Sequence, residues 1–229
     1  HLSHRRQRQM CIRDSYRKYH LIHHKHTETD LDPDKSLTDP FPVSKKSFSR
    51  KVLRDLTGIS GLRRYFGYLY SAWGVNENTF FGHLKHFVSS LYGFLICQLI
   101  IFSTLTFFNV PWLYLLLWWI PKLTIFSLFY RLRSISEHAC TSGQDDFTHT
   151  RTTLSSNFVR YFIAPLNVNY HLEHHLFMFC PWYNLPKAHE MLKEKDFYKD
   201  LEIENGYFNV FKKVIISVSY THLTLPTKA

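Results

Sequence analysis

The sequence predicts an all-α integral membrane helical bundle, in which a transmembrane hairpin separates two cytosolic segments that carry a histidine-rich site. Three observations predict it. Two long apolar runs lie close together near the middle of the 229 residues, the flanking segments are polar, and one five-residue histidine pattern occurs on each side of the apolar runs. A hydrophobic content of 45% with 17% aromatic residues suits globular and membrane proteins alike, so the distribution along the chain decides.

The two ends of the chain do not continue the patterns of their neighbours. Residues 7–15, QRQMCIRDS, and residues 217–229, SVSYTHLTLPTKA, resemble peptides that arise when sequencing-adapter DNA is translated. We therefore expect residues 1–15 and 217–229 to be foreign and one domain to occupy residues 16–216. We also expect the natural protein to begin well before residue 16, so that this chain is N-terminally truncated.

The net charge of +10 does not predict nucleic-acid binding. Four arginines and one aspartate fall within the first fifteen residues, and no motif for reading bases is visible. The remaining positive charge suits a cytosolic face held against anionic lipid. Four cysteines without C-x-x-C spacing are typical of free thiols in a reducing compartment.

The apolar runs predict two membrane spans. Residues 16–84 are polar and predict cytosolic helices and loops. Residues 87–108 then form a run of 22 residues without a charge, enough at 1.5 Å per residue to cross a hydrocarbon core about 30 Å thick. Residues 109–111, Asn-Val-Pro, break this run, and residues 112–130 form a weaker span interrupted by a proline and a lysine. Residues 87–130 thus predict a hairpin.

Basic residues orient this hairpin. Lys85 precedes it, Arg131 and Arg133 follow it, and its tip has none, which places both ends in the cytosol of a bacterial cell or on the cytosolic side of the endoplasmic reticulum. The alternative is a buried hairpin in a soluble protein, and the lack of Asp, Glu, Lys and Arg over residues 87–120 argues against it. Residues 132–216 return to polar sequence, where LPKAHEMLKEK predicts an amphipathic helix.

Two copies of H-x-x-H-H, about 150 residues apart, carry the main chemical signal. Their histidines are His20, His23 and His24, and His171, His174 and His175. Positions i, i+3 and i+4 share one face of a helix, so each copy offers three imidazoles to one point. Imidazole suits iron, copper, nickel and zinc, and six ligands exceed what one tetrahedral zinc uses. Because the hairpin returns the chain to its starting side, we expect both copies to form one metal site at the cytosolic surface.

Other histidines are weighed by their position. His138 follows the second span and is the next candidate ligand, because the chain emerges there beside the same site. His26 points away from its motif on an ideal helix and is expected at the surface or in support of a ligand. His83 and His86 are expected to face lipid headgroups, and His189 to be structural.

Carboxylates near the motifs are expected to orient the imidazoles. Glu137, Glu173 and the acidic residues of the polar stretch 145–153 are the candidates for hydrogen bonds to ligand histidines.

The residues resemble a known family. YRKYHLIHHKHT with Asp32-Pro33-Asp34, then SEHA, NVNYHLEHHLF and LPKAH, are similar to the second and third histidine boxes of membrane fatty acid desaturases, over roughly residues 16–195. The resemblance implies a four-span membrane enzyme with two non-haem iron ions, which uses dioxygen and electrons from ferredoxin or a b-type cytochrome to desaturate a lipid or acyl thioester. It implies that the iron ligands are His20, His23, His24, His138, His171, His174 and His175.

The chain departs from that family pattern at its beginning. An earlier H-x-x-x-H or H-x-x-x-x-H box, which should follow a first pair of spans, is absent before His20. We therefore expect this chain by itself to hold at most a partial metal site and to have no turnover, although its parent is an enzyme.

Two further functions stay open. A hydroxylase or ketolase of the same scaffold would insert oxygen into an alkane, carotenoid or sphingoid lipid, and sub-ångström placement of the substrate carbon separates it from a desaturase. A non-catalytic zinc- or copper-binding membrane protein is the second. Ionisable groups would be expected along a transport path, and residues 87–120 have none.

Overall fold

The computed structural model describes residues 14–74, 78–141, 149–199 and 201–216. The chain divides into two compact units. We call residues 1–48 with 131–229 the histidine unit, and residues 49–130 the hairpin unit. Residues 1–13 and 217–229 lie outside the described residues, so the foreign origin of the two ends stays a prediction.

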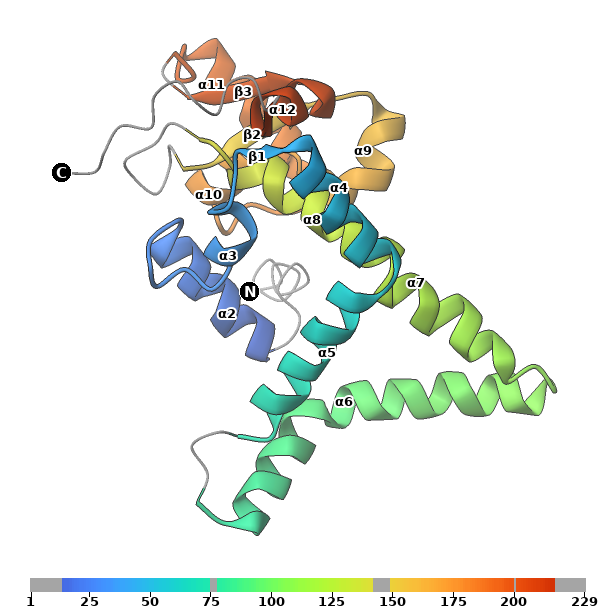
Figure 1. Ribbon diagram of the computed structural model, residues 1–229. Helices are drawn as coiled ribbons and strands as arrows, with labels where there is room; N and C mark the ends of the chain where they lie inside the picture. Colours follow the sequence, from blue (N-terminus) through green and yellow to red (C-terminus); the bar gives the residue numbers. More distant parts are fainter. Residues whose placement is uncertain (1–13, 75–77, 142–148, 200, 217–229) are drawn as a thin grey trace. The chain divides into compact units, whose positions relative to one another are not determined.

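The histidine unit is built mostly of short helices (Figure 1). Its elements are α2 Asp14–His26, α3 Lys35–Thr38, β1 Val43–Ser44, the first residues of α4 Lys45–Leu56, the end of α8 Ile125–His138, β2 Arg151–Leu154, α9 Asn157–Ile163, α10 His171–Leu176, α11 Leu185–Glu194, β3 Glu202–Asn205, α12 Tyr207–Val214 and β4 Ile215–Ile216. The helix at α11 confirms the amphipathic helix predicted from LPKAHEMLKEK.

Four short strands correct the expectation of a purely helical fold. β1 pairs with β4 and β2 pairs with β3, each in parallel. β2 reads RTTL, and its β-branched threonines favour extended backbone. The register places Arg151 opposite Glu202, so that the guanidinium Nε lies 2.9 Å from the carboxylate Oε2. Helical periodicity could not reveal strands of two to four residues.

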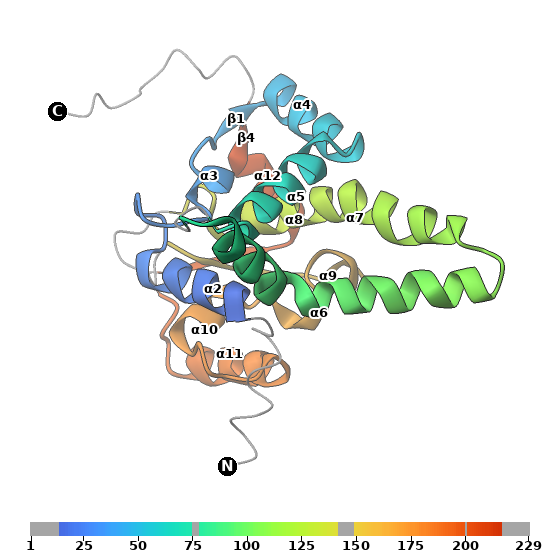
Figure 2. The same ribbon diagram turned by 90° about the horizontal axis from the view of Figure 1, so that it is seen from below.

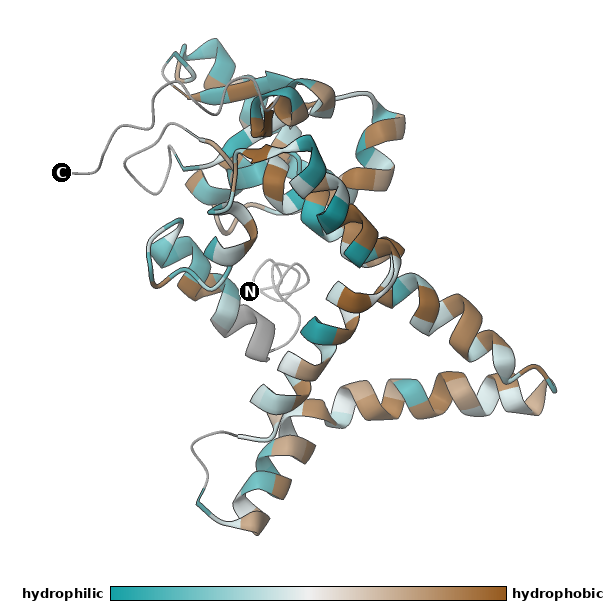
Figure 3. Ribbon diagram, viewed as in Figure 1, coloured by the Kyte–Doolittle hydropathy of each residue, from teal (hydrophilic) through white to brown (hydrophobic). Residues whose placement is uncertain are grey.

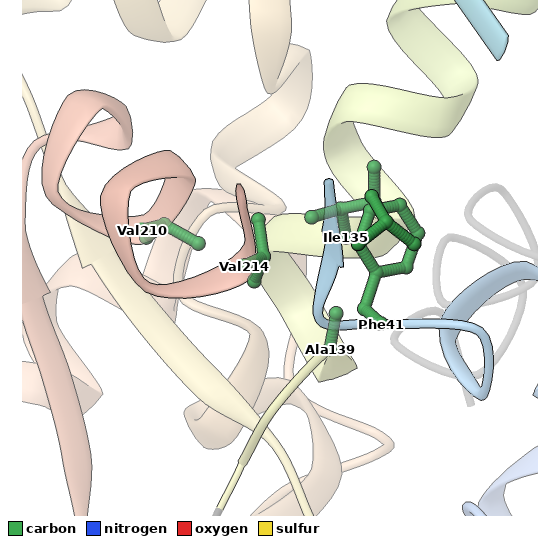
Figure 4. Close-up of a cluster of buried hydrophobic side chains, with 6 residues drawn as sticks. Phe41, Ile135, Ala139, Val210 and Val214 are labelled. Carbon is green, nitrogen blue, oxygen red and sulfur yellow. The ribbon is translucent and has the colours of Figure 1, made fainter. Parts of the chain in front are cut away.

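The apolar core of the histidine unit gathers residues that are far apart in the sequence. Its buried members are Phe41, Val43, Ile135, Ala139, Val210 and Val214. Figure 4 shows Phe41 and Ile135 side by side, with Val214 approaching from α12. Ile135 lies in the last turn of α8, so this packing holds the C-terminal end of α8 in place within the unit.

The hairpin unit contains helices joined by turns, with no strand among its described residues. It contains the remainder of α4, then α5 Ile59–Ala72, α6 Phe80–Phe107, a π-helical segment Tyr114–Trp119, α7 Ile120–Leu123 and the start of α8. Thr79 begins α6 by accepting a hydrogen bond from the Gly82 backbone N–H at 3.1 Å. Asn109 has φ of 60°, a left-handed conformation that asparagine tolerates, and the chain reverses there as predicted (Figures 1 and 2).

Two helical stretches are long and apolar enough to cross a membrane by length and composition. They are Phe80–Phe107, with 28 residues, and Tyr114–His138, with 25 residues. Their apolar windows are 0% and 11% buried, whereas a core helix of a soluble protein would be covered. Figure 3 shows that hydrophobic residues predominate along α6. Pro121 does not end the second stretch, because it lies in the first turn of α7, where a missing N–H is tolerated.

Two polar side chains on the second arm of the hairpin, Tyr114 and Lys122, contact residues of α6. The Tyr114 hydroxyl donates a hydrogen bond of 2.7 Å to Gln98 Oε1, which joins the π-helical segment to α6. The Lys122 ammonium lies 4.7 Å from the ring centre of Phe94 and 5.3 Å from that of Trp119. Such contacts give these polar groups partners within the protein.

At Gly61 in the hairpin unit, α5 packs so closely against α7 that there is no room for a side chain. A Cβ added there would lie 2.6 Å from Leu123 Cα, whereas one added at Gly67 of the same helix would meet nothing within 4 Å. We expect Gly61→Ala to lower the free energy of unfolding by about 1–3 kcal/mol. Gly67→Ala should leave it unchanged or raise it by up to roughly 1 kcal/mol, since alanine favours helix. Thermal unfolding in detergent compares them, and equal effects would contradict this packing.

Candidate metal centre

α2 brings the first histidine motif to one face. The i, i+3 and i+4 spacing aligns His20, His23 and His24 on a helix of 13 residues. His23 is buried, and its Nδ1–H donates to Asp32 Oδ1 at 2.9 Å. The Nε2 of His23 is therefore the nitrogen left for another ligand role.

Asp32 is itself held in place by backbone donors. Its two oxygens accept from the N–H of Glu28 at 2.7 Å and from that of Asp34 at 2.8 Å. Burial alone would raise the pKa of Asp32, but the hydrogen bond and charge of His23, together with these backbone donors, hold it below its ordinary value. In return, the pKa of His23, which burial lowers, is raised above its usual range chiefly by Asp32. The loop after α2 thus orients one motif histidine.

α10 carries the second motif. All three of its histidines, His171, His174 and His175, are buried. The helix has only six residues, and β2 lies against it: the Thr152 hydroxyl accepts the Leu172 N–H at 3.3 Å.

α8 delivers His138 at its last residue. The His138 Nδ1–H donates to the backbone carbonyl of His149 at 2.8 Å, which again leaves Nε2 free to point elsewhere. The buried guanidinium of Arg151 donates through Nη2 to the carbonyls of Ala139 and Cys140 at 3.1 and 3.2 Å, just beyond the helix. These bonds satisfy carbonyls at the helix end and fix the direction of His138.

The seven candidate ligands come together in two groups. We call His23, His138, His171 and His175 the four-histidine group, and His20, His24 and His174 the three-histidine group; within each, one nitrogen per residue lies within 4.8 Å of all the others. In the three-histidine group the Nε2 atoms are 3.0 Å apart in each pair. In the four-histidine group His171 Nε2 lies 2.8 Å from that of His138 and 3.2 Å from that of His175.

These separations fit ligands of a metal ion. Two nitrogens that each lie roughly 2.1 Å from one ion, at about a right angle, are about 3 Å apart. Hydrogen bonding cannot explain the three-histidine group as well, because each Nε2 faces two others and a neutral imidazole has one N–H in all. A cation at the centre of each group would satisfy the facing lone pairs.

The protonation of the rings also suits a metal. Burial, followed by the charge of neighbouring histidines, lowers the pKa of His20 to about 4, that of His24 to about 2 and that of His174 to about 3. The pKa values of His171 and His175 are likewise lowered well below the ordinary value by burial. These rings are neutral at pH 7, which is the form that binds metal.

The glutamates that were expected to hydrogen-bond the candidate ligand histidines have other partners. Glu137 Oε1 lies 3.8 Å from His171 Nδ1, too far for a hydrogen bond, and 2.9 Å from Arg133 Nε. Glu173 bonds His189 and not a ligand histidine. The acidic residues 145 and 146 lie outside the described residues, and His149 contributes its backbone carbonyl.

Histidines set aside in the sequence lie outside both groups. His26 belongs to neither group. His83 and His86 bond the backbone carbonyls of Trp73 and Ala72 through Nδ1, at 2.9 and 2.8 Å. His189 is buried against Glu173, in agreement with a structural role, although its partner was not foreseen.

Comparison with known proteins agrees with the histidine pattern. A search of curated proteins and a search of solved structures each found no match. The model of the family described as fatty acid desaturase matches residues 13–203, a range that contains both histidine motifs and His138. The chain therefore belongs to the fatty acid desaturase family.

Proposed function

We propose that the chain carries the di-iron centre of a membrane enzyme that introduces a double bond into a fatty acyl chain. One observation carries this proposal: seven imidazoles, drawn from three helices, converge in one group of four and one group of three. Two such groups side by side suit two ions, and an all-imidazole donor set suits a redox-active transition metal. Membership of the fatty acid desaturase family supplies the substrate class.

In this proposal the four-histidine group holds one iron and the three-histidine group the other. Bound iron would supply the oxidising power, with dioxygen and with electrons from ferredoxin or a b-type cytochrome. The protein contributes rings that are already oriented: Asp32 fixes His23, and the carbonyl of His149 fixes His138. Such preorganisation holds the ligands in place before any ion arrives.

The hairpin supports a membrane location. Its two long apolar stretches remain exposed in the structure, and lipid is the solvent that suits such surfaces. With both ends cytosolic, as the basic residues predict, the histidines would meet their lipid or acyl thioester substrate at the cytosolic face of the bacterial inner membrane or the endoplasmic reticulum.

The test is expression of the gene that contains this sequence in a host that lacks the unsaturation, with His171→Ala as control. Mass spectrometry of the fatty acids should show a new double bond that disappears in the control, because His171 belongs to the four-histidine group. Hydroxylated or ketonic products would instead indicate a hydroxylase or ketolase. Purified protein that contains zinc or copper, without iron and without product, would contradict an oxygen-dependent enzyme.

A further inference from the structure

The helix that carries the second motif, α10, is too short to hold its orientation without contacts from neighbouring elements. α10 spans six residues, and no side chain caps its N-terminus at Tyr170. Isolated helices of this length are unstable in water, so packing and hydrogen bonds from outside must fix its rotation. His174 needs such fixing most, because its buried Nδ1 has no hydrogen-bond partner among the residues that the structure describes.

Glu173 lies in the middle of this helix and is fully buried. Its Oε1 accepts from His189 Nδ1 and from the Tyr198 hydroxyl, each at 2.5 Å. Its Oε2 accepts from the Thr152 hydroxyl, also at 2.5 Å. One carboxylate thus receives three donors, from β2, from α11 and from the chain that follows α11.

Thr152 ties the backbone of α10 to the same point. Its hydroxyl donates to Glu173 and accepts the Leu172 N–H at 3.3 Å. Burial and then the bond to Glu173 raise the pKa of Tyr198, so this hydroxyl also stays protonated and donates. The side chain and the backbone of one helical turn are therefore held together by neighbouring elements.

The anchored side of α10 is opposite to its histidines. At 100° per residue, Glu173 points about 150° away from the mean direction of the three motif histidines. Bonds that hold Glu173 therefore aim His171 and His175 at the four-histidine group and His174 at the three-histidine group.

We propose that Glu173 is a positioning residue for both metal-binding groups, acting through the rotation of α10 and without contact with either ion. This inference rests on the proposed metal centre. A carboxylate can accept from all three donors, whereas a glutamine has the same shape but turns one end into an NH2 donor that faces another donor. Glu173→Gln should therefore disturb the helix without leaving a cavity.

The experiment is a titration of the purified, metal-free chain with Co²⁺, followed by the visible absorption of bound cobalt. Glu173→Gln should weaken the cobalt affinity of both groups by about 10- to 100-fold and change the absorption bands. His138→Ala, which alters one group only, provides the contrast. Glu204→Gln is the matched control, because this glutamate pairs with Lys213 of α12.

A second pair of variants guards against misfolding of the first. Thr152→Val removes the hydroxyl at nearly constant volume and should weaken both groups, whereas Thr152→Ser keeps the hydroxyl and should restore affinity to within threefold of wild type. Affinities of Glu173→Gln and Thr152→Val that both stay within threefold of wild type would overturn the role of Glu173. If the wild-type chain itself binds no cobalt, the proposed metal centre fails instead.

Discussion

Replacing His20 with alanine is expected to remove the ion of the three-histidine group and to leave that of the four-histidine group. His20 lies on α2 and its Nε2 is 3.0 Å from those of His24 and His174. Two remaining ligands are too few to retain iron, whereas no member of the other group changes. His138→Ala should have the reciprocal effect, because His138 belongs to the four-histidine group alone.

Iron analysis and Mössbauer spectroscopy of the purified variants test this division. Each variant should retain about half of the wild-type iron, and the two should lose different spectral components. In a host that expresses the gene containing this sequence, each variant should lower desaturation by more than the roughly 10- to 100-fold produced by changes in residues that only support ligands. His26→Ala is the control, since His26 is on α2 and belongs to neither group. Loss of all iron in both variants would show one indivisible site and contradict two separate groups.

The second large effect is expected at Asp32. Asp32→Asn keeps the size of the side chain but places an NH2 where three donors now converge, from His23 and from two backbone N–H groups. The free energy of unfolding should fall by about 1–3 kcal/mol, because a buried donor loses its acceptor. Metal affinity should fall about 10- to 100-fold in the four-histidine group, to which His23 belongs.

Asp30→Asn is the matched control for this variant. Asp30 lies in the same loop, and its exposed carboxylate bonds Lys35 at 2.6 Å. Exposed ion pairs contribute little, so unfolding and cobalt binding should stay near wild type. The interpretation of Asp32 would be wrong if its variant weakened both groups equally, since Asp32 contacts one ligand and Glu173 anchors a helix that serves both.

The alignment of the candidate histidines could be predicted from sequence because the rule that aligns them is local. Three imidazoles at i, i+3 and i+4 share a helix face wherever the helix is placed, and both motifs obey it. The division into four and three could not be predicted in this way. It depends on how α2, α8 and α10 approach one another, which no spacing within a single motif encodes.

The residues that support the histidines were harder to predict from sequence, because their contacts also depend on how separate elements pack together. Glu173 sits between ligand histidines in the sequence, so the pattern favoured a bond to one of them. Its actual partners, Thr152, His189 and Tyr198, are 21, 16 and 25 residues away. Asp32 was easier to single out, because Asp32-Pro33-Asp34 lies shortly after the first motif, but only the structure shows that Asp32 bonds His23.

The two long apolar helices likewise followed from composition, whereas their details did not. Uncharged runs predict length and polarity, and the two long helices agree with them. The structure extends the first helix back to Phe80 and carries the second through Pro121, because a π-helical segment and a new helix start accommodate the proline. Such local adjustments depend on packing between the arms.

The two motifs are separated by about 150 residues of chain. A bound ion would therefore also act as a crosslink that stabilises the fold. An ion shared by α2 and α10 would close that length into a ring, and the apolar hairpin would lie inside the ring. For a ring of this size, the entropy withheld from the unfolded chain is worth about 5 kcal/mol in the simplest treatment of crosslinks. Iron supply would then govern how long the folded chain survives proteolysis as well as whether it can react.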